Sequence, residues 1–136
     1  MKSADAIKNF IENNLEGFAP GAVVIGSISL SRYEQKNLCV IVPEETEVTE
    51  RYINGSVETD TTFTVSFFFR GEKYSLLVEK MEVIADTIQR LSMKKLAAET
   101  GVAGVQLGKI EYYYDCGTVE NQATGLDVKM TITEEK

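Results

Sequence analysis

The side chains that could carry chemistry in this chain are mainly carboxylates, because the sequence contains no histidine. Histidine is the commonest general base and metal ligand, so its absence excludes histidine-dependent catalytic triads and the usual zinc sites. The sequence also lacks a Cys-x-x-Cys metal spacing and a phosphate-binding Gly-x-x-x-x-Gly-Lys motif. Paired carboxylates alone can catalyse hydrolysis, so the search for a catalytic site turns to the acidic residues.

Four glutamates gather in one short stretch: Glu44, Glu45, Glu47 and Glu50. Few apolar residues accompany them, so we interpret this stretch as a solvated acidic surface. A site for a hard cation such as Ca²⁺ is the alternative, since carboxylate oxygens are its preferred ligands. No coherent set of acid, base and nucleophile emerges from the sequence. We therefore expect no enzymatic activity, no cofactor and no metal.

The two cysteines do not make a disulfide framework. Cys39 stands in the apolar segment 38–42 and is predicted to be a small core residue. Cys116 stands in a predicted turn, and a disulfide between the two is the less favoured alternative. The first residues include charges at Lys2 and Asp5, so we expect no secretory signal and synthesis in a reducing cytoplasm.

A run of three tyrosines could serve as a binding surface. Alternate side chains of a strand face opposite sides, so we expect Tyr112 and Tyr114 to pack under a helix and Tyr113 to be exposed. An exposed tyrosine favours a subunit contact over a ligand site, because tyrosine is enriched at protein interfaces.

Length and charge limit the class of protein. A chain of 136 residues with 43% hydrophobic residues can form one domain with a real core. The formal net charge is −7, from 21 acidic and 14 basic residues, which argues against nucleic acid or an anionic membrane as the primary partner. No run approaches the roughly 18 apolar residues of a membrane-spanning helix.

The first segment is predicted to be a short amphipathic helix, with Ser3 as its N-cap and Gly17 as its end. Its apolar residues recur at helical spacing: Ala4, Ile7, Phe10, Ile11 and Leu15. Two strands are expected next, at 22–31 and 37–42. The polar turn 32–36 joins them as an antiparallel pair, with the second strand central in the sheet because it is apolar on both faces.

Pro43 is expected to end that strand, and a projecting hairpin arm to follow at about 44–62. Asn54–Gly55 predicts a type I′ turn at its tip. The flanks 47–53 and 57–62 carry few apolar residues, so we expect them to project from the body of the domain. Such a hairpin is marginal alone and its edges invite pairing. It is either a loose loop protected by its charges or an arm ordered by a neighbouring subunit, through strand addition or a docked tip.

The returning strand enters the core, with one apolar face made by Phe63, Val65, Phe67 and Phe69. Phe68 points to the opposite face and could mark a covered surface. A long amphipathic helix at 73–96 is expected to lie across the aromatic face. Its apolar residues form one stripe: Tyr74, Leu77, Val78, Met81, Ile84, Ala85, Ile88 and Leu91.

A loose glycine-rich connection at 101–108 precedes the last two strands, expected at 109–115 and 126–133 and paired as an antiparallel hairpin. In the last strand Leu126, Val128, Met130 and Ile132 should face inward. The predicted fold is therefore one α+β domain over 1–136. It has a mixed, mostly antiparallel curved sheet, a long helix on one face, a short N-terminal helix and a projecting hairpin.

The segment 51–56 (Arg-Tyr-Ile-Asn-Gly-Ser), followed by 63–67 (Phe-Thr-Val-Ser-Phe) and a helix from Tyr74 to Leu91, resembles minor capsid and tail-terminator proteins. These proteins are encoded by tailed phages and prophages of Gram-positive bacteria. They show a similar Tyr-hydrophobic-Asp/Asn-Gly-Ser turn before a phenylalanine-bearing strand, and a similar order of elements.

The resemblance implies a structural virion protein that forms a ring, commonly a hexamer, caps the tail tube and joins it to the head connector. It implies tail-tube and connector proteins as partners, and DNA that only passes through. The protein would occupy the host cytoplasm during assembly and then the tail or neck of the virion. The interface residues we predict are Tyr52, Ile53, Asn54, Gly55, Phe68 and Tyr113. The alternative is a small-ligand-binding module with a pocket between helix and sheet.

Overall fold

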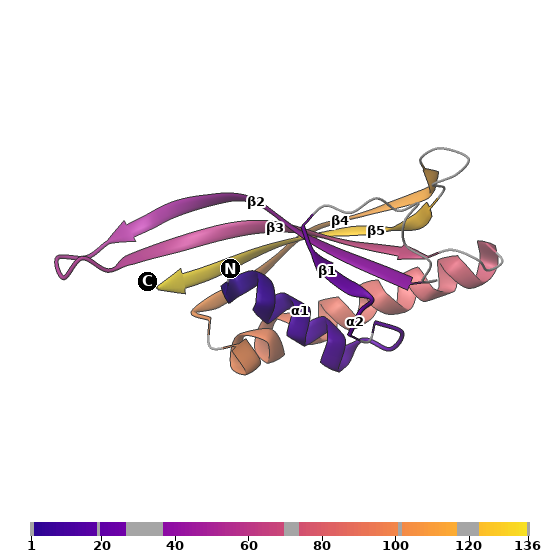
Figure 1. The fold of residues 1–136 in the computed structure, drawn as a ribbon, viewed down its shortest axis with the longest axis horizontal. Helices are drawn as coiled ribbons and strands as arrows, with labels where there is room; N and C mark the ends of the chain where they lie inside the picture. The colour runs from indigo at the N-terminus through magenta and orange to yellow at the C-terminus, as the bar shows by residue number, and fades with distance from the viewer. Residues whose placement is uncertain are drawn as a thin grey trace.

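The computed structural model describes residues 2–18, 20–26, 37–69, 74–100, 102–116 and 123–135. Two helices, α1 (Lys2–Asn14) and α2 (Tyr74–Thr100), lie on one side of an open five-stranded sheet (Figure 1). The strands are β1 (Val23–Ile25), β2 (Asn37–Arg51), β3 (Val57–Phe69), β4 (Gly104–Cys116) and β5 (Ala123–Glu135). Their order across the sheet is β1-β2-β3-β5-β4, and only β1 and β2 are parallel. The predicted mixed α+β fold is confirmed.

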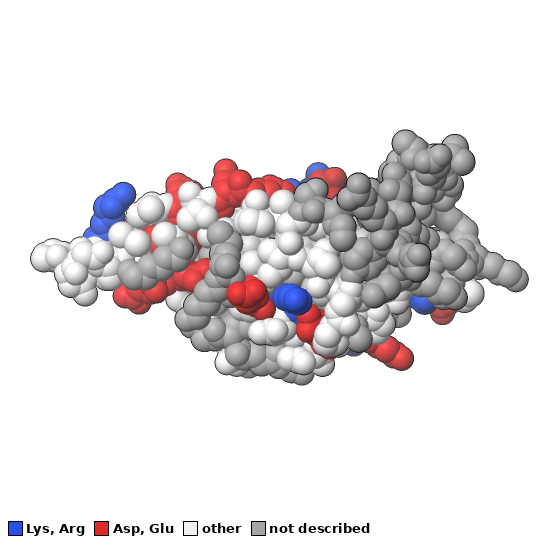
Figure 2. Space-filling model, in the orientation of Figure 1, with Lys and Arg blue, Asp and Glu red and all other residues white. Residues whose placement is uncertain are grey.

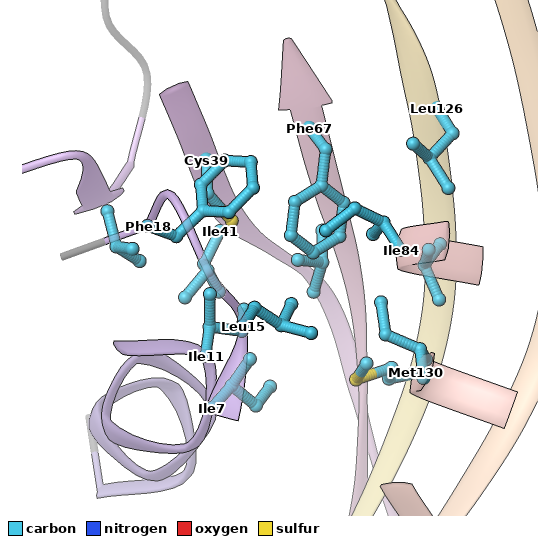
Figure 3. Close-up of a cluster of buried hydrophobic side chains, with 14 of the residues drawn as sticks. Ile7, Ile11, Leu15, Phe18, Cys39, Ile41, Phe67, Ile84, Leu126 and Met130 are labelled. Carbon is cyan, nitrogen blue, oxygen red and sulfur yellow. The ribbon is translucent and has the colours of Figure 1, made fainter. Parts of the chain in front are cut away.

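The core lies between the two helices and one face of the sheet, and Figure 3 shows part of it. The alternation predicted for β3 is confirmed, because Phe63, Phe67 and Phe69 are all buried. Phe18, which follows α1, meets Phe67 edge-to-face with ring centroids 5.3 Å apart. The stripes predicted on the helices contribute buried residues to the same cluster: Ala4, Ile7, Phe10, Ile11 and Leu15 from α1, and Leu77, Met81, Ile84, Ala85 and Ile88 from α2.

The N-terminal helix differs from the prediction at its first turn. It already includes Lys2, so Ser3 lies inside the helix, and the Ser3 hydroxyl is buried without a hydrogen-bond partner among the described residues. Ser3 is therefore a packing residue and not an N-cap. After the helix, Gly17 has φ of +90°, and a Cβ at this position would lie 2.6 Å from the side-chain Nδ2 of Asn37. Glycine is favoured there by its positive φ, since the Asn37 side chain could move away from an added Cβ.

The prediction that the first two strands pair antiparallel is wrong. β1 has three residues and runs parallel to β2, with Val23 opposite Cys39 and Ile25 opposite Ile41. Parallel neighbours need a connection that returns the chain to the starting end of the sheet. Polar residues such as those of the expected turn 32–36 occur in tight turns and in longer return connections alike, so the sequence pattern could not fix the strand direction. The expected turn, and residues 27–31 of the expected strand, lie outside the described part of the chain.

Pro43 does not end β2, which continues to Arg51. The Cys39 amide donates to the Ala22 carbonyl at 2.7 Å, and the Ile41 carbonyl accepts from the Gly26 amide. Pro43 is the next residue in this alternation, so its nitrogen faces the same edge, beyond the last residue of β1. Proline is tolerated there because no amide hydrogen is needed. The central position predicted for 37–42 is confirmed by the burial of residues 38–41.

The C-terminal half follows the predicted order with longer elements. α2 extends to Thr100, and the expected glycine-rich connection is largely part of β4. Gly108 lies where the β4–β5 register shifts, and a Cβ there would lie 3.2 Å from the Lys129 Cβ. Glycine therefore allows the strands to approach at an irregularity. Cys116 belongs to β4 and not to a free turn.

β5 confirms its predicted pattern, because Leu126, Val128, Met130 and Ile132 are all buried. It pairs with β4 as expected, and its other neighbour is β3. Cys39 is a free, buried thiol, as expected for a core residue. Burial raises the pKa of the Cys39 thiol well above its usual value, because the thiolate would lose its hydration.

Replacing Phe67 by alanine should lower the free energy of unfolding by about 3–5 kcal/mol, because it opens a cavity beside Phe18 in the middle of the core. Urea unfolding followed by circular dichroism measures this change. Tyr112→Ala is the control, because the Tyr112 side chain is 45% exposed and its loss should cost little. Equal effects of the two substitutions would contradict the assigned core.

Candidate assembly surface

The tip of the β2–β3 hairpin is a turn of defined geometry. The Gly55 amide donates to the Tyr52 carbonyl at 3.1 Å, and the Tyr52 amide donates to the Ser56 carbonyl at 3.0 Å. Ile53 and Asn54 therefore occupy the central positions, and Gly55, with φ of +89°, follows them. This is a three-residue loop with glycine after the turn, not the type I′ turn predicted with Asn54 and Gly55 at its centre.

Asn54 stabilises this loop from within. Its side-chain oxygen accepts hydrogen bonds from the Ser56 amide at 3.0 Å and from the Ser56 hydroxyl at 2.6 Å. Asparagine commonly closes turns in this way. Asn54 and Gly55 therefore shape the tip, and the side chain that they present to solvent is Ile53, which is fully exposed.

Tyr52, at the base of the loop, is partly exposed, and its hydroxyl donates to the Glu50 carboxylate at 3.2 Å. Partial desolvation and the negative charge of Glu50 raise the pKa of Tyr52, and the more distant carboxylates of Glu58 and Glu135 act in the same direction. Three carboxylates thus influence one tyrosine at the tip.

The structure corrects the extent of the projecting arm. β3 pairs with β5 from Glu58 (opposite Glu135) to Phe69 (opposite Thr124), so it is held on both sides almost to the turn. Thr59 and Thr61, expected to be in a projecting flank, are buried. The projecting part is therefore the tip around 52–56 with the last residues of β2 and the first of β3, which reach beyond the C-terminal end of β5 in Figure 1.

The outer edge of β2 is open between Val42 and Arg51, where no described strand lies beside it. Three features of this edge discourage another strand from adding to it: Pro43, the acidic side chains, and two register shifts at 43/45 and 48/50. Prolines, charges and bulges are the means by which proteins protect sheet edges. Of the two routes to a neighbouring subunit expected from the sequence, a docked tip is therefore favoured over strand addition.

The sheet face opposite the helices is acidic along the arm. Glu47 lies opposite Asp60, and Glu50, Glu58 and Glu135 form one row across three neighbouring strands. Figure 2 shows the resulting acidic surface along the hairpin, with a basic side chain close to its tip. Lys129 is the cation in the middle of this face, where its ammonium group contacts the Glu44 carboxylate and the Thr64 hydroxyl.

Within the described ranges, no group of three potential ligands is placed to hold a metal ion. The cation site considered for the glutamates of the arm therefore gains no support from their arrangement. No helix of the described chain is long and apolar enough to cross a bilayer.

The other two predicted interface residues lie at the far end of the sheet from the tip. Phe68 and Tyr113 stand in one row, on either side of Gly125. The Phe68 side chain is half-buried, and the Tyr113 side chain lies outside the described part. Tyr112, expected to pack under a helix, is 45% exposed instead, although it lies opposite the buried Leu126, on the edge strand β4. The predicted interface residues thus form two separate groups.

A groove of about 590 Å³ lies at the same far end, between α2 and the sheet, where the ligand-binding alternative expects a pocket; its lining residues were not predicted. It is formed by the segment after α1, the paired ends of β2 and β3, and the first turns of α2. Its lining residues are Glu16, Gly17, Asn37, Phe69, Leu76, Glu79, Lys80, Val83 and Ile84. Leu76 and Val83 are 47% and 58% exposed. Their i, i+7 spacing on α2 was the available sequence signal, because two apolar residues outside the main stripe shared one helix face.

Comparison of the sequence with models of known protein families and with curated proteins finds no match.

Replacing Glu58 by glutamine should raise the free energy of unfolding by about 0.2–1 kcal/mol, because it removes the central charge of the carboxylate row. It should also lower the pKa of Tyr52 toward its usual value, since the Glu58 charge contributes to the upward shift. Urea unfolding and tyrosine NMR titration measure the two effects.

Glu79→Gln is the matched control, because the Glu79 side chain is exposed on α2, away from the row. If the gain from Glu58→Gln did not shrink at high salt, charge repulsion would not be its cause.

Proposed function

We propose that this protein is a structural component of a phage or prophage virion, a tail terminator or minor capsid protein that assembles into a ring at the head–tail junction. The observation that carries this proposal is the hairpin tip, which extends beyond the sheet and presents a fully exposed isoleucine. The chain's resemblance to phage proteins gives the proposal its biological setting.

The construction of the arm supports assembly over a loose loop. β3 is paired on both sides almost to the turn, and Asn54 closes the turn internally. A braced hairpin loses less conformational entropy on binding than a flexible loop would. The domain therefore holds an apolar side chain in a fixed place outside its own core, as expected for a contact with another subunit.

A ring also fits the position of the arm. Closed rings arise when one patch of a subunit meets a different patch on the next, and the rotation closes. A tip at one end of the long axis provides one such patch. Partners for the ring faces are tail-tube and head-connector proteins, which places the protein in the host cytoplasm during assembly and then in the virion.

The acidic sheet face suits a ring through which DNA passes. Carboxylates repel the phosphate backbone, so an acidic channel lets DNA slide without binding. In this proposal DNA is cargo in transit, and no nucleic-acid site is assigned.

A small-ligand-binding module is the second candidate, and the groove beside α2 favours it. Its volume of about 590 Å³ lies in the range of small-molecule sites. A ligand-binding module would remain a monomer or simple dimer, and an apolar ligand would raise its melting temperature.

Removing the tip should abolish the ring and leave the domain folded. We would replace residues 49–58 by an Asn-Gly dipeptide, so that the cross-strand neighbours Val48 and Thr59 flank a two-residue turn. Light scattering and electron microscopy of the wild type should reveal closed rings, and the shortened protein should be monomeric with an unchanged circular dichroism spectrum.

The control is a protein of full length with Tyr112→Ala, an exposed substitution far from the tip, which should still form rings. A wild type that stays monomeric at every concentration would refute the proposed function. Rings formed by the shortened protein would refute the role of the arm.

A further inference from the structure

We propose that the hairpin tip of one copy docks into the groove beside α2 of the next copy, with Ile53 placed against Leu76 and Val83. This inference rests on the proposed self-assembly and specifies its contact. It assigns an occupant to the groove, and it gives the exposed tip a complementary surface.

The two surfaces match in apolar character. Ile53 is a fully exposed isoleucine, and the groove offers two partly exposed aliphatic side chains on one face of α2, with Phe69 and Ile84 beneath them. The groove volume of about 590 Å³ can hold more than one side chain. Burying apolar surface from both sides provides the driving force for the contact.

Their charges are complementary as well. Arg51 is exposed next to the tip, and among the residues that the structure describes it forms no ion pair. The groove rim carries Glu16 and Glu79, both exposed and likewise without an ion pair in those parts of the chain, and Lys80 is the one basic residue among its lining residues. In the docked pair, Arg51 beside the tip would lie close to Glu16 and Glu79 at the rim of the groove. This attraction orients the docked tip.

The contact must form between molecules. Asn37 and Phe69 stand at one end of the hairpin and line the groove, whereas the tip is at the other end. At about 3.3 Å per residue, the thirteen residues of β3 separate the two by roughly 40 Å. Because β3 is paired on both sides, the tip cannot fold back into its own groove.

Because the tip and the groove lie at opposite ends of the same molecule, the contact between copies is head-to-tail. Each copy then donates one tip and accepts one, which generates a ring when the rotation between copies closes. The proline, bulges and charges on the open edge of β2 suppress the competing contact in which strands add side by side. With strand addition suppressed, docking of the tip into the groove is the contact that we propose between copies.

The first test compares charged substitutions at exposed apolar positions by concentration-dependent light scattering. Ile53→Asp in the tip and Val83→Asp in the groove should each raise the concentration for half-assembly at least tenfold, because each introduces a charge that docking would bury. The matched controls Val48→Asp on β2 and Ile25→Asp on β1 should leave assembly unchanged. All four side chains are exposed, so the fold should survive in each variant.

The second test locates the contact directly. In a Cys116→Ser background, protein with Ile53→Cys is mixed with protein carrying Val83→Cys and treated with a short bis-maleimide linker; Cys39 is buried and should not react. Crosslinked pairs should form in this mixture, and few should form when Val48→Cys replaces Ile53→Cys.

The outcomes separate the two proposals. Rings that persist in the Ile53→Asp and Val83→Asp proteins, with no tip-to-groove crosslink, would overturn the docking while the proposed function stands. A wild type that never assembles would overturn both. An apolar ligand that binds the groove of a monomeric protein would favour the ligand-binding module instead.

Discussion

The structure depends on the double pairing of β3. This strand runs between β2 and β5 for almost its whole length, and its inward face is covered by both helices. Beyond Phe63 the inward positions continue as Thr61 and Thr59, which are buried although they are polar. The Thr61 hydroxyl forms a hydrogen bond with that of Thr46 at 2.9 Å, which offsets part of the cost of burial. The core thus extends along the strand toward the tip, and this extension braces the hairpin.

Bracing changes what the tip can do. A free hairpin would have to be ordered on binding, whereas a tip carried by a strand with two neighbours is already in position. The open side of the hairpin is β2 alone, and there the chain places proline, bulges and carboxylates. Strand pairing is therefore favoured on the β3 side of the hairpin, next to β5, and discouraged along the open edge of β2.

Local periodicity predicted most elements, because the features that determine them lie within a few residues. The apolar stripe of α2, the alternation of β5 and the aromatic face of β3 could all be read from spacing alone. The parallel direction of β1 and the place of β5 beside β3 depend on contacts between distant segments. No pattern within a single segment contains that information.

The candidate site likewise has a part that the sequence could predict and a part that it could not. The Asn-Gly pair located the tip, although hydrogen bonding placed Ile53 and Asn54 at the centre of the turn. A pocket between helix and sheet was expected only in outline, and its lining residues could not be predicted because they are far apart in the chain, from Glu16 to Ile84. Leu76 and Val83 looked like isolated apolar residues on a helix surface, and such residues are common. Only their position next to the ends of β2 and β3 shows that they line one groove.

The distribution of charge explains how an acidic protein could still associate with itself. A net charge of −7 and a row of carboxylates opposing one another along the arm keep copies apart at most orientations. Arg51 adds one positive charge beside the acidic row at the tip, while Glu16 and Glu79 stand with Lys80 at the groove. Attraction is then available when a tip approaches a groove, and repulsion acts when two arms or two grooves meet. The same charges that oppose general aggregation would therefore select the head-to-tail contact.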